Sequence, residues 1–338
     1  MIIILKKGAT EADARPILDQ ITAAGLQPLY LPGEEKIVIG AIGDERVLEK
    51  LQLDADARVE RVVPILKPYK LANREFKGES SVVDVAGVKI GGEELVVIAG
   101  PCAVETEEQI FAAARAVKAA GAKMFRAGAY KPRTSPYAFQ GLEEEGLRLL
   151  AAVRKETGLP IVTELISEHD LEKVQAATDM FQIGARNMQN FRLLKAVGAT
   201  RTPVLLKRGP AASLGDLLMA AEYIMSEGNP NVVLCERGIK SFFSDTRNTL
   251  DLSIVPLLKR ETHLPVIVDP SHGTGVRSIV SQMSLAGVAA GADGLIIEVH
   301  PKPEVAWSDG FQQLSPDEFS QLVVKLRKVA DAVDRRIP

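Results

Sequence analysis

Eight short apolar runs rich in valine, isoleucine and leucine recur between residues 95 and 298, and a stretch of helical character follows each run. Buried strands that alternate with helices over ~250 residues predict a parallel (β/α)8 barrel. Beyond the eighth run, Phe319, Leu322, Leu326 and Ala330 recur at helical spacing, which predicts a final amphipathic helix. The expected strands are Leu95–Ala99, Lys123–Arg126, Pro160–Glu164, Asp179–Gly184, Pro203–Lys207, Asn231–Glu236, Pro265–Asp269 and Asp293–Glu298.

The first 66 residues have a different pattern, in which short strands and helices follow the order strand, helix, strand, strand, helix, strand. This order predicts a ferredoxin-like α+β domain. We expect residues 67–80 to be a linker, and residues 81–338 to be the barrel, opened by a β-hairpin that covers its bottom. The hairpin is expected at Ser81–Ile90 with a turn at Gly91-Gly92. The expected N-terminal elements are Ile2–Leu5, Glu11–Ala24, Gln27–Leu31, Lys36–Ile42, Glu45–Leu51 and Val59–Leu66.

Composition excludes several functional classes. The chain has 338 residues, 46% hydrophobic and 25% charged, as in ordinary soluble globular proteins. Its net charge of −3 gives no reason to expect nucleic acid or a membrane surface as a partner. The apolar segment Ile2–Leu5 is too short for a signal peptide or a membrane span, so we expect a cytoplasmic protein. There, Cys102 and Cys235 would be thiols rather than a disulfide.

Cations gather where the second expected barrel strand ends. Arg126, Lys131 and Arg133 are interleaved with glycine and proline and followed by the hydroxyls of Thr134 and Ser135. Such a loop suits phosphate and carboxylate oxygens, although three cations alone fit a solvated basic loop equally well. Because active sites of this fold lie at the carboxyl ends of the strands, charged residues after the other strands favour an anion-binding mouth. Those residues are Glu164, Arg186, Lys207, Arg208, Glu236, Arg237 and Asp269.

A second group of side chains would reach the same mouth. Cys102, His272, Glu298 and Asp309 combine a thiol, an imidazole and two carboxylates, which together suit a divalent transition metal. From the residues alone this site stays open, and His300 could replace His272 as a ligand. Cys235 lies inside an apolar run and is interpreted as core.

Six ordered motifs carry a resemblance to a known family. The sequence is similar to the 3-deoxy-D-arabino-heptulosonate 7-phosphate (DAHP) synthases, in the type I β branch with a ferredoxin-like N-terminal domain. The resemblance spans nearly the whole chain. The motifs are Ile-Ala-Gly-Pro-Cys at 98–102, Lys-Pro-Arg-Thr-Ser at 131–135, Gln-Ile-Gly-Ala-Arg-Asn at 182–187, Leu-Leu-Lys-Arg-Gly at 205–209, Cys-Glu-Arg-Gly at 235–238 and Asp-Pro-Ser-His at 269–272.

The resemblance implies a condensation of phosphoenolpyruvate with erythrose 4-phosphate, the first step of the shikimate route to aromatic amino acids. It implies a divalent metal such as Mn, Fe, Co or Zn on Cys102, His272, Glu298 and Asp309. Lys131 would donate a proton to the aldehyde oxygen and Glu164 would orient the attacking water. The implied ligands of phosphoenolpyruvate are Arg126, Lys131, Arg186, Lys207, Arg237 and Asp269, and those of the erythrose phosphate group are Arg133, Thr134 and Ser135.

The family also implies a homotetramer and feedback inhibition by phenylalanine or tyrosine at the N-terminal domain, which could instead serve assembly alone. Three alternatives stay open. A 3-deoxy-D-manno-octulosonate 8-phosphate synthase would take arabinose 5-phosphate, but that family resembles Lys-Ala-Asn-Arg-Ser at 131–135. A Schiff-base aldolase would use Lys207 as its nucleophile. A silent sugar-phosphate-binding protein would keep the cations without catalysis.

Overall fold

The structure is a computed structural model that describes residues 1–33, 36–43, 47, 51, 53–63, 67–133 and 135–337. The chain divides into two compact units, Met1–Gly78 and Glu79–Pro338. Most of the expected linker, residues 67–80, therefore belongs to the first compact unit. Within that unit, a Cβ added at Gly40 would lie 2.7 Å from Phe76 Cε2, so the Phe76 ring packs directly on a strand.

The first unit is one antiparallel sheet covered by a helix, α1 (Glu11–Ala23). Its strand order, β2-β3-β1-β4, confirms the ferredoxin-like prediction. Ile17 and Ile21 of α1 share a core with Ile3 and Ile39 of the sheet. The predicted helix at residues 45–51 and the predicted strand end at 64–66 lie outside, or mostly outside, the described residues. The strands are β1 (Ile2–Leu5), β2 (Gln27–Pro32), β3 (Ile37–Ile42) and β4 (Val59–Val63), and a 3-10 turn, η2, spans Leu53–Ala55.

The second unit contains a closed barrel of eight parallel strands, which confirms the predicted fold. Strands that follow one another in sequence are neighbours in the barrel, and the last strand, β14, closes the ring against the first, β7. Every predicted barrel strand is present, with ends that differ by at most one residue. The strands are β7 (Val96–Gly100), β8 (Met124–Arg126), β9 (Ile161–Glu164), β10 (Met180–Ile183), β11 (Val204–Lys207), β12 (Val232–Glu236), β13 (Val266–Val268) and β14 (Gly294–Glu298).

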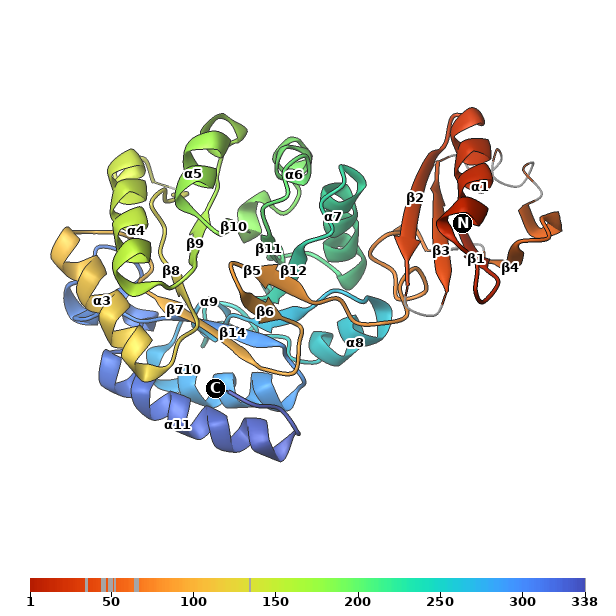
Figure 1. Cartoon of the computed structure of the whole chain (residues 1–338). Helices are drawn as coiled ribbons and strands as arrows, with labels where there is room; N and C mark the ends of the chain where they lie inside the picture. Colours follow the sequence, from red (N-terminus) through yellow and green to blue (C-terminus); the bar gives the residue numbers. More distant parts are fainter. Residues whose placement is uncertain are drawn as a thin grey trace. The chain divides into compact units, whose positions relative to one another are not determined.

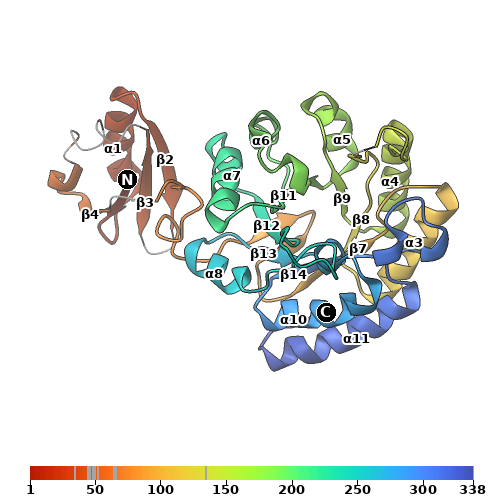
Figure 2. The same ribbon diagram turned by 180° about the vertical axis from the view of Figure 1, so that it is seen from behind.

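Helices follow every barrel strand and cover its outer face (Figure 1). Seen from behind, α10 and α11 again lie side by side beneath the strands (Figure 2). Capping boxes start α7 at Ser213 and α11 at Ser315, where a carboxylate three residues on accepts the cap N–H. Among the described helices, none is long and apolar enough to cross a bilayer. The helices are α3 (Glu107–Ala120), α4 (Glu143–Thr157), α5 (Leu171–Ala177), α6 (Phe191–Gly198), α7 (Leu214–Ser226), α8 (Ile254–Glu261), α9 (Pro270–Thr274), α10 (Arg277–Ala289) and α11 (Pro316–Ala332).

The predicted hairpin is present as β5 (Val83–Val85) and β6 (Val88–Ile90). Its turn lies at Ala86-Gly87, not at Gly91-Gly92 as predicted from sequence. Both turn residues have positive φ, 50° and 91°, which is the twist that a two-residue hairpin requires. Val83, Val85 and Ile90 join the core at the amino-terminal end of the barrel strands. The hairpin therefore covers the bottom of the barrel and leaves the opposite end open.

Candidate active site

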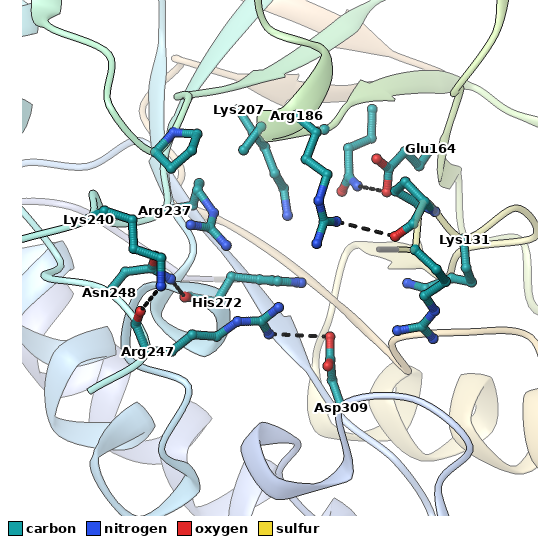
Figure 3. Close-up of a pocket in the computed structure, with 16 residues that line it drawn as sticks. Lys131, Glu164, Arg186, Lys207, Arg237, Lys240, Arg247, Asn248, His272 and Asp309 are labelled. Carbon is teal, nitrogen blue, oxygen red and sulfur yellow. Dashed lines mark hydrogen bonds and ion pairs between the residues drawn. The ribbon is translucent and has the colours of Figure 1, made fainter. Parts of the chain in front are cut away.

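A cavity of about 290 Å³ lies at the carboxyl ends of the barrel strands. Seven of the described residues that line it are lysines or arginines. They come from the ends of several strands and point into the same space (Figure 3). The basic mouth predicted from the strand ends is therefore assembled by the fold. The charged and polar lining residues are Lys131, Arg133, Glu164, Gln182, Arg186, Lys207, Arg237, Lys240, Arg247, Asn248, His272 and Asp309.

The loop after β8 supplies one wall of the cavity. Lys131 is buried, and its Nζ lies 3.0 Å from both the carbonyl oxygen and the Sγ of Cys102. Arg133 donates to the Ser308 hydroxyl at 2.5 Å. Across the mouth, Arg186 donates to the Pro132 carbonyl at 3.2 Å (Figure 3). These bonds fix three cations around one opening.

Glu164, at the end of β9, faces the cavity beside the next strand. Its Oε2 accepts a hydrogen bond from Gln182 Nε2 at 3.2 Å. A Cβ at Gly184 would fall 2.0 Å from Glu164 Oε1, so only glycine leaves room for this carboxylate. The motif Gln-Ile-Gly therefore positions an acid at the edge of a basic cavity.

His272 is oriented by a buried carboxylate, Asp269. Asp269 Oδ2 lies 2.8 Å from His272 Nδ1 and 2.5 Å from Lys207 Nζ. Burial raises the pKa of Asp269, but attraction to His272 and Lys207 outweighs it and holds the pKa well below its usual range. The ionised carboxylate therefore keeps the imidazole proton on Nδ1 and turns the lone pair of Nε2 outward, while burial lowers the pKa of His272. This is the form of histidine that binds a metal.

Three side chains of the kinds that bind metals meet beside the cavity. One donor atom from each of Cys102, Glu298 and Asp309 lies within 4.8 Å of the other two. His272 Nε2 lies 3.4 Å from Glu298 Oε1, so the imidazole adjoins the same group. Asp309 has a left-handed backbone with φ of 50°, an uncommon conformation for a residue other than glycine. All four predicted ligands are therefore brought together.

The electrostatics of this group fit a divalent cation. Burial and the Glu298 carboxylate raise the pKa of the Cys102 thiol to about 12, although Lys131 opposes the shift. Burial likewise raises the pKa of Glu298, but His272, Arg126 and Lys131 more than offset it and lower it to about 2. A bound cation reverses the local electrostatics and deprotonates a coordinating thiol. Thiolate, imidazole and carboxylate donors together suit a transition metal rather than Mg²⁺ or Ca²⁺.

Two further cations are buried near the cavity, and one of them, Arg126, adjoins these donors. Arg126 donates to Glu298 Oε1 at 2.6 Å, while its Nε is buried and has no partner among the described residues. Arg237 lines the cavity, and burial lowers the pKa of its guanidinium. Buried donors are almost always satisfied, so both groups indicate an anionic ligand.

Not every predicted substrate-binding residue lines the cavity. Arg126 is buried and bonded to Glu298. Asp269 is buried and bonded to both Lys207 and His272. Ser135 is exposed, accepts the Tyr137 N–H at 3.3 Å, and is not among the described lining residues. Thr134 lies outside the described residues. Of the described residues in the motif at 131–135, Lys131, Pro132 and Arg133 line the cavity, whereas the sequence also predicted Ser135.

Sequence reasoning missed part of the lining. Lys240, Arg247 and Asn248 all lie in the long segment between β12 and α8. Arg247 NH1 lies 3.4 Å from Asp309 Oδ2, and Lys240 donates to the Arg247 carbonyl (Figure 3). In the sequence, the signal for these residues is that Lys240 and Arg247 both lie in the long segment after β12.

The barrel, its cation-lined mouth and the donor group are those of a (β/α)8 enzyme whose cavity suits small anions beside side chains that could hold a metal. Comparison with known proteins narrows this class. Residues 70–335 match the model of the DAHP synthetase I family, and residues 1–67 match the DAHP synthase ferredoxin-like domain. The chain therefore belongs to the DAHP synthetase I family, and it is an enzyme of DAHP synthesis.

Individual relatives agree with this assignment. The chain is 48% identical over 337 residues to phospho-2-dehydro-3-deoxyheptonate aldolase of Thermotoga maritima, with 100% of both sequences covered. The crystal structure of that aldolase, named as a DAHP synthase, superimposes with a TM-score of 0.80 at 47% identity and covers 100% of this chain. A 2-dehydro-3-deoxyphosphooctonate aldolase of Geobacter sp. is 34% identical over 74% of this chain and 97% of its own length.

Proposed function

We propose that the cavity condenses phosphoenolpyruvate with D-erythrose 4-phosphate and water to give DAHP and phosphate. The observation that carries this proposal is the meeting of seven cations, His272 and Asp309 in one cavity of about 290 Å³, with buried Cys102 and Glu298 next to Asp309 and His272. Two phosphorylated anions repel each other, and a ring of cations offsets that repulsion. Holding them aligned also removes part of the entropic barrier.

Phosphoenolpyruvate would occupy the part of the cavity that four of its cations surround. Lys131, Arg186, Lys207 and Arg237 line this space and would hold its phosphate and carboxylate. Arg126 would contribute from behind, and the unpartnered Nε of that side chain supports a ligand there. Asp269 would act indirectly, through its bonds to Lys207 and His272.

Erythrose 4-phosphate would direct its phosphate to Arg133. Arg133 lines the cavity and is fixed by bonds to the Phe139 carbonyl at 2.9 Å and the Ser308 hydroxyl at 2.5 Å. A fixed guanidinium binds phosphate as a planar fork. Ser135 stays a proposed contact that a modest loop rearrangement would have to bring inward. Thr134 also stays a proposed contact.

Cys102, His272, Glu298 and Asp309 would hold a divalent transition metal. Such a metal supplies Lewis acidity that polarises the aldehyde oxygen toward attack by C3 of phosphoenolpyruvate. Lys131 Nζ lies 3.0 Å from Cys102 Sγ and faces the cavity, so it is placed to give a proton to that oxygen. Glu164 would orient the water that adds at C2, before phosphate leaves by cleavage of its carbon–oxygen bond.

A Schiff-base aldolase is less well supported. Lys207 Nζ lies 2.5 Å from Asp269 Oδ2 and is almost fully buried, a geometry for an ion pair rather than for imine formation. The octulosonate alternative is weakened because the relative that carries that name matches only 74% of this chain.

One assay tests the activity. Phosphate release from phosphoenolpyruvate is measured with erythrose 4-phosphate or arabinose 5-phosphate, before and after chelation. We expect release with the four-carbon aldose, loss on chelation and recovery with Mn²⁺ or Co²⁺. Equal rates with both aldoses, or activity that survives exhaustive chelation, would contradict the proposal.

Regulation belongs to the N-terminal unit in this proposal. A ferredoxin-like domain of the family precedes the barrel, and phenylalanine or tyrosine would bind it in a homotetramer of a cytoplasmic enzyme. A chain that starts near Ser80 should stay active and lose inhibition. If that shortened chain is still fully inhibited, the regulatory site lies in the barrel.

A further inference from the structure

The loop between β14 and α11 carries Asp309 to the donor group, and buried side chains fasten this loop to the segment after β7. Gln313 is fully buried, and its Oε1 accepts the Cys102 N–H at 3.0 Å. Its Nε2 donates to the Ser308 carbonyl at 2.7 Å. The Gln313 amide therefore joins the backbone of Cys102 to the backbone of Ser308, the residue before Asp309.

Glu105 makes a second bridge between the same two segments. Its Oε1 accepts the Trp307 N–H at 2.9 Å, and its Oε2 lies 3.2 Å from His300 Nε2. His300 Nδ1 accepts the Lys302 N–H at 3.0 Å, so the ring proton must be on Nε2, from which it is donated to Glu105. A buried carboxylate is costly unless its oxygens are bonded, and both oxygens of Glu105 are used on this loop.

The two bridges meet the loop at Trp307 and Ser308, directly before Asp309. Asp309 itself has φ of 50°, a conformation that persists only where the surroundings hold it. Its Oδ2 lies 3.5 Å from Cys102 Sγ, although 206 residues separate the two in sequence. Glu105 and Gln313 thus join the two segments that carry these donors, together with the 3.0 Å contact between Cys102 Sγ and the Ser308 hydroxyl.

We propose that Glu105 and Gln313 are positioning residues that set the spacing of Cys102 and Asp309, and thereby the affinity of the site for a divalent transition metal. This inference rests on the proposed metal site. Partners behind metal ligands typically change metal affinity by about 10- to 100-fold when they are replaced. They act through the ligands, so the chemistry of the fully loaded enzyme should change little.

The test uses Co²⁺ as the probe and the full chain. Gln313→Glu keeps the acceptor for the Cys102 N–H but turns the donor that faces the Ser308 carbonyl into an oxygen. Glu105→Gln keeps an oxygen that accepts the Trp307 N–H. It removes the carboxylate oxygen that accepts the hydrogen bond from His300 Nε2. We expect the Kd for Co²⁺ to rise about 10- to 100-fold in each variant. At saturating Co²⁺, kcat should return to within about twofold of the parent.

The thiolate-to-cobalt charge-transfer absorption gives a readout that a general loss of stability would not change. Its position should shift in both variants, because the Cys102–Asp309 spacing changes, while thermal unfolding monitors the fold. Val305→Ala is the matched control, since Val305 lies on the same loop and is largely exposed. It should leave both the Kd and the absorption unchanged.

The outcomes separate this inference from the proposed function. A parent protein that shows the thiolate absorption, with variants whose Kd for Co²⁺ and spectrum are unchanged, overturns the positioning role and leaves the metal site intact. A parent that binds Co²⁺ without thiolate absorption overturns the metal site and this inference with it. Because the two variants break different bridges, failure of one to fold leaves the other as a test.

Discussion

The two ends of the barrel treat charge in opposite ways. At the bottom, Asp293 is bonded to Lys259 at 2.5 Å and to the Val266 N–H at 2.8 Å, beneath an apolar hairpin. At the mouth, seven cations face one cavity whose described lining holds only two carboxylates, Glu164 and Asp309. The charge of Asp293 is therefore satisfied within the protein. At the mouth, Lys207 and Arg247 also have carboxylate partners, but the other five cations have no ion pair among the described residues and are left for a ligand. Stability and function are thus separated along the barrel axis.

This separation has an energetic reason. Removing an ion from water costs several kcal/mol, and a partner in the protein can offset that cost only if it remains bonded. At the mouth, the partner would be a substrate that arrives and leaves, so the folded protein retains part of the cost. Variants at the two ends should therefore change different measured quantities.

The largest effect is expected at Cys102. Cys102→Ser removes the thiolate, and loss of several kcal/mol of Lewis-acid stabilisation lowers kcat about 10⁴-fold. Bound metal and phosphate release are the measurements. The control is Cys235→Ala, which removes a buried core thiol from β12 and should keep metal-dependent activity at reduced stability. Full activity of the Cys102 variant would contradict the assignment of function to the mouth of the barrel, because Cys102 would then have only a structural role.

Lys131 should show the next largest effect. Lys131→Met removes the proposed proton donor, and kcat should fall about 10³-fold while the fold is kept. Steady-state kinetics with both substrates is the measurement. Lys240→Met removes another cation of the same cavity and should raise KM more than it lowers kcat. Equal losses of kcat in both variants would indicate that the cavity needs only positive charge, without a specific proton donor.

At the bottom, Asp293 should affect stability alone. Asp293→Asn weakens the bonds to Lys259 and Arg335 and leaves two cations short of a partner, so the free energy of unfolding should fall by about 3 kcal/mol. Urea unfolding gives this value, and kcat measured on the folded protein should stay within about twofold. A large fall in kcat with unchanged stability would show that the bottom of the barrel also serves catalysis.

The smallest effect is expected for a paired charge near the mouth. Burial raises the pKa of Glu318, but bonds to Arg277 and Ser315 outweigh it and lower the pKa below its ordinary value of 4.5. A carboxyl whose folded pKa is depressed stabilises the protein above its unfolded pKa and loses this contribution as pH falls through the folded pKa. Glu318→Gln should therefore cost about 0.5–1 kcal/mol at pH 7 and less near pH 3. Urea unfolding at both pH values tests this sign, and kcat should not change.

Much of the fold could be predicted from sequence because its signals are local. Each apolar run and helical stretch carries its own period, so all eight barrel strands were placed to within two residues. The hairpin turn was misplaced because Gly91-Gly92 and Ala86-Gly87 are both plausible turns by residue type. The pairing of Val85 with Val88 in the folded hairpin shows that Ala86-Gly87 is the turn.

For the site, the sequence by itself determined which charged residues end the strands, and hence that one mouth would be basic. The tertiary structure decided which of them reach the cavity: it directs Lys131 and Arg186 inward, places Asp269 behind His272, and adds Lys240 and Arg247 from a long loop. It also decided the bond between Gln313 and the Cys102 N–H, across 211 residues of chain. Strand ends follow from periodicity within a few residues, whereas the direction of a side chain depends on neighbours that only the closed barrel brings together.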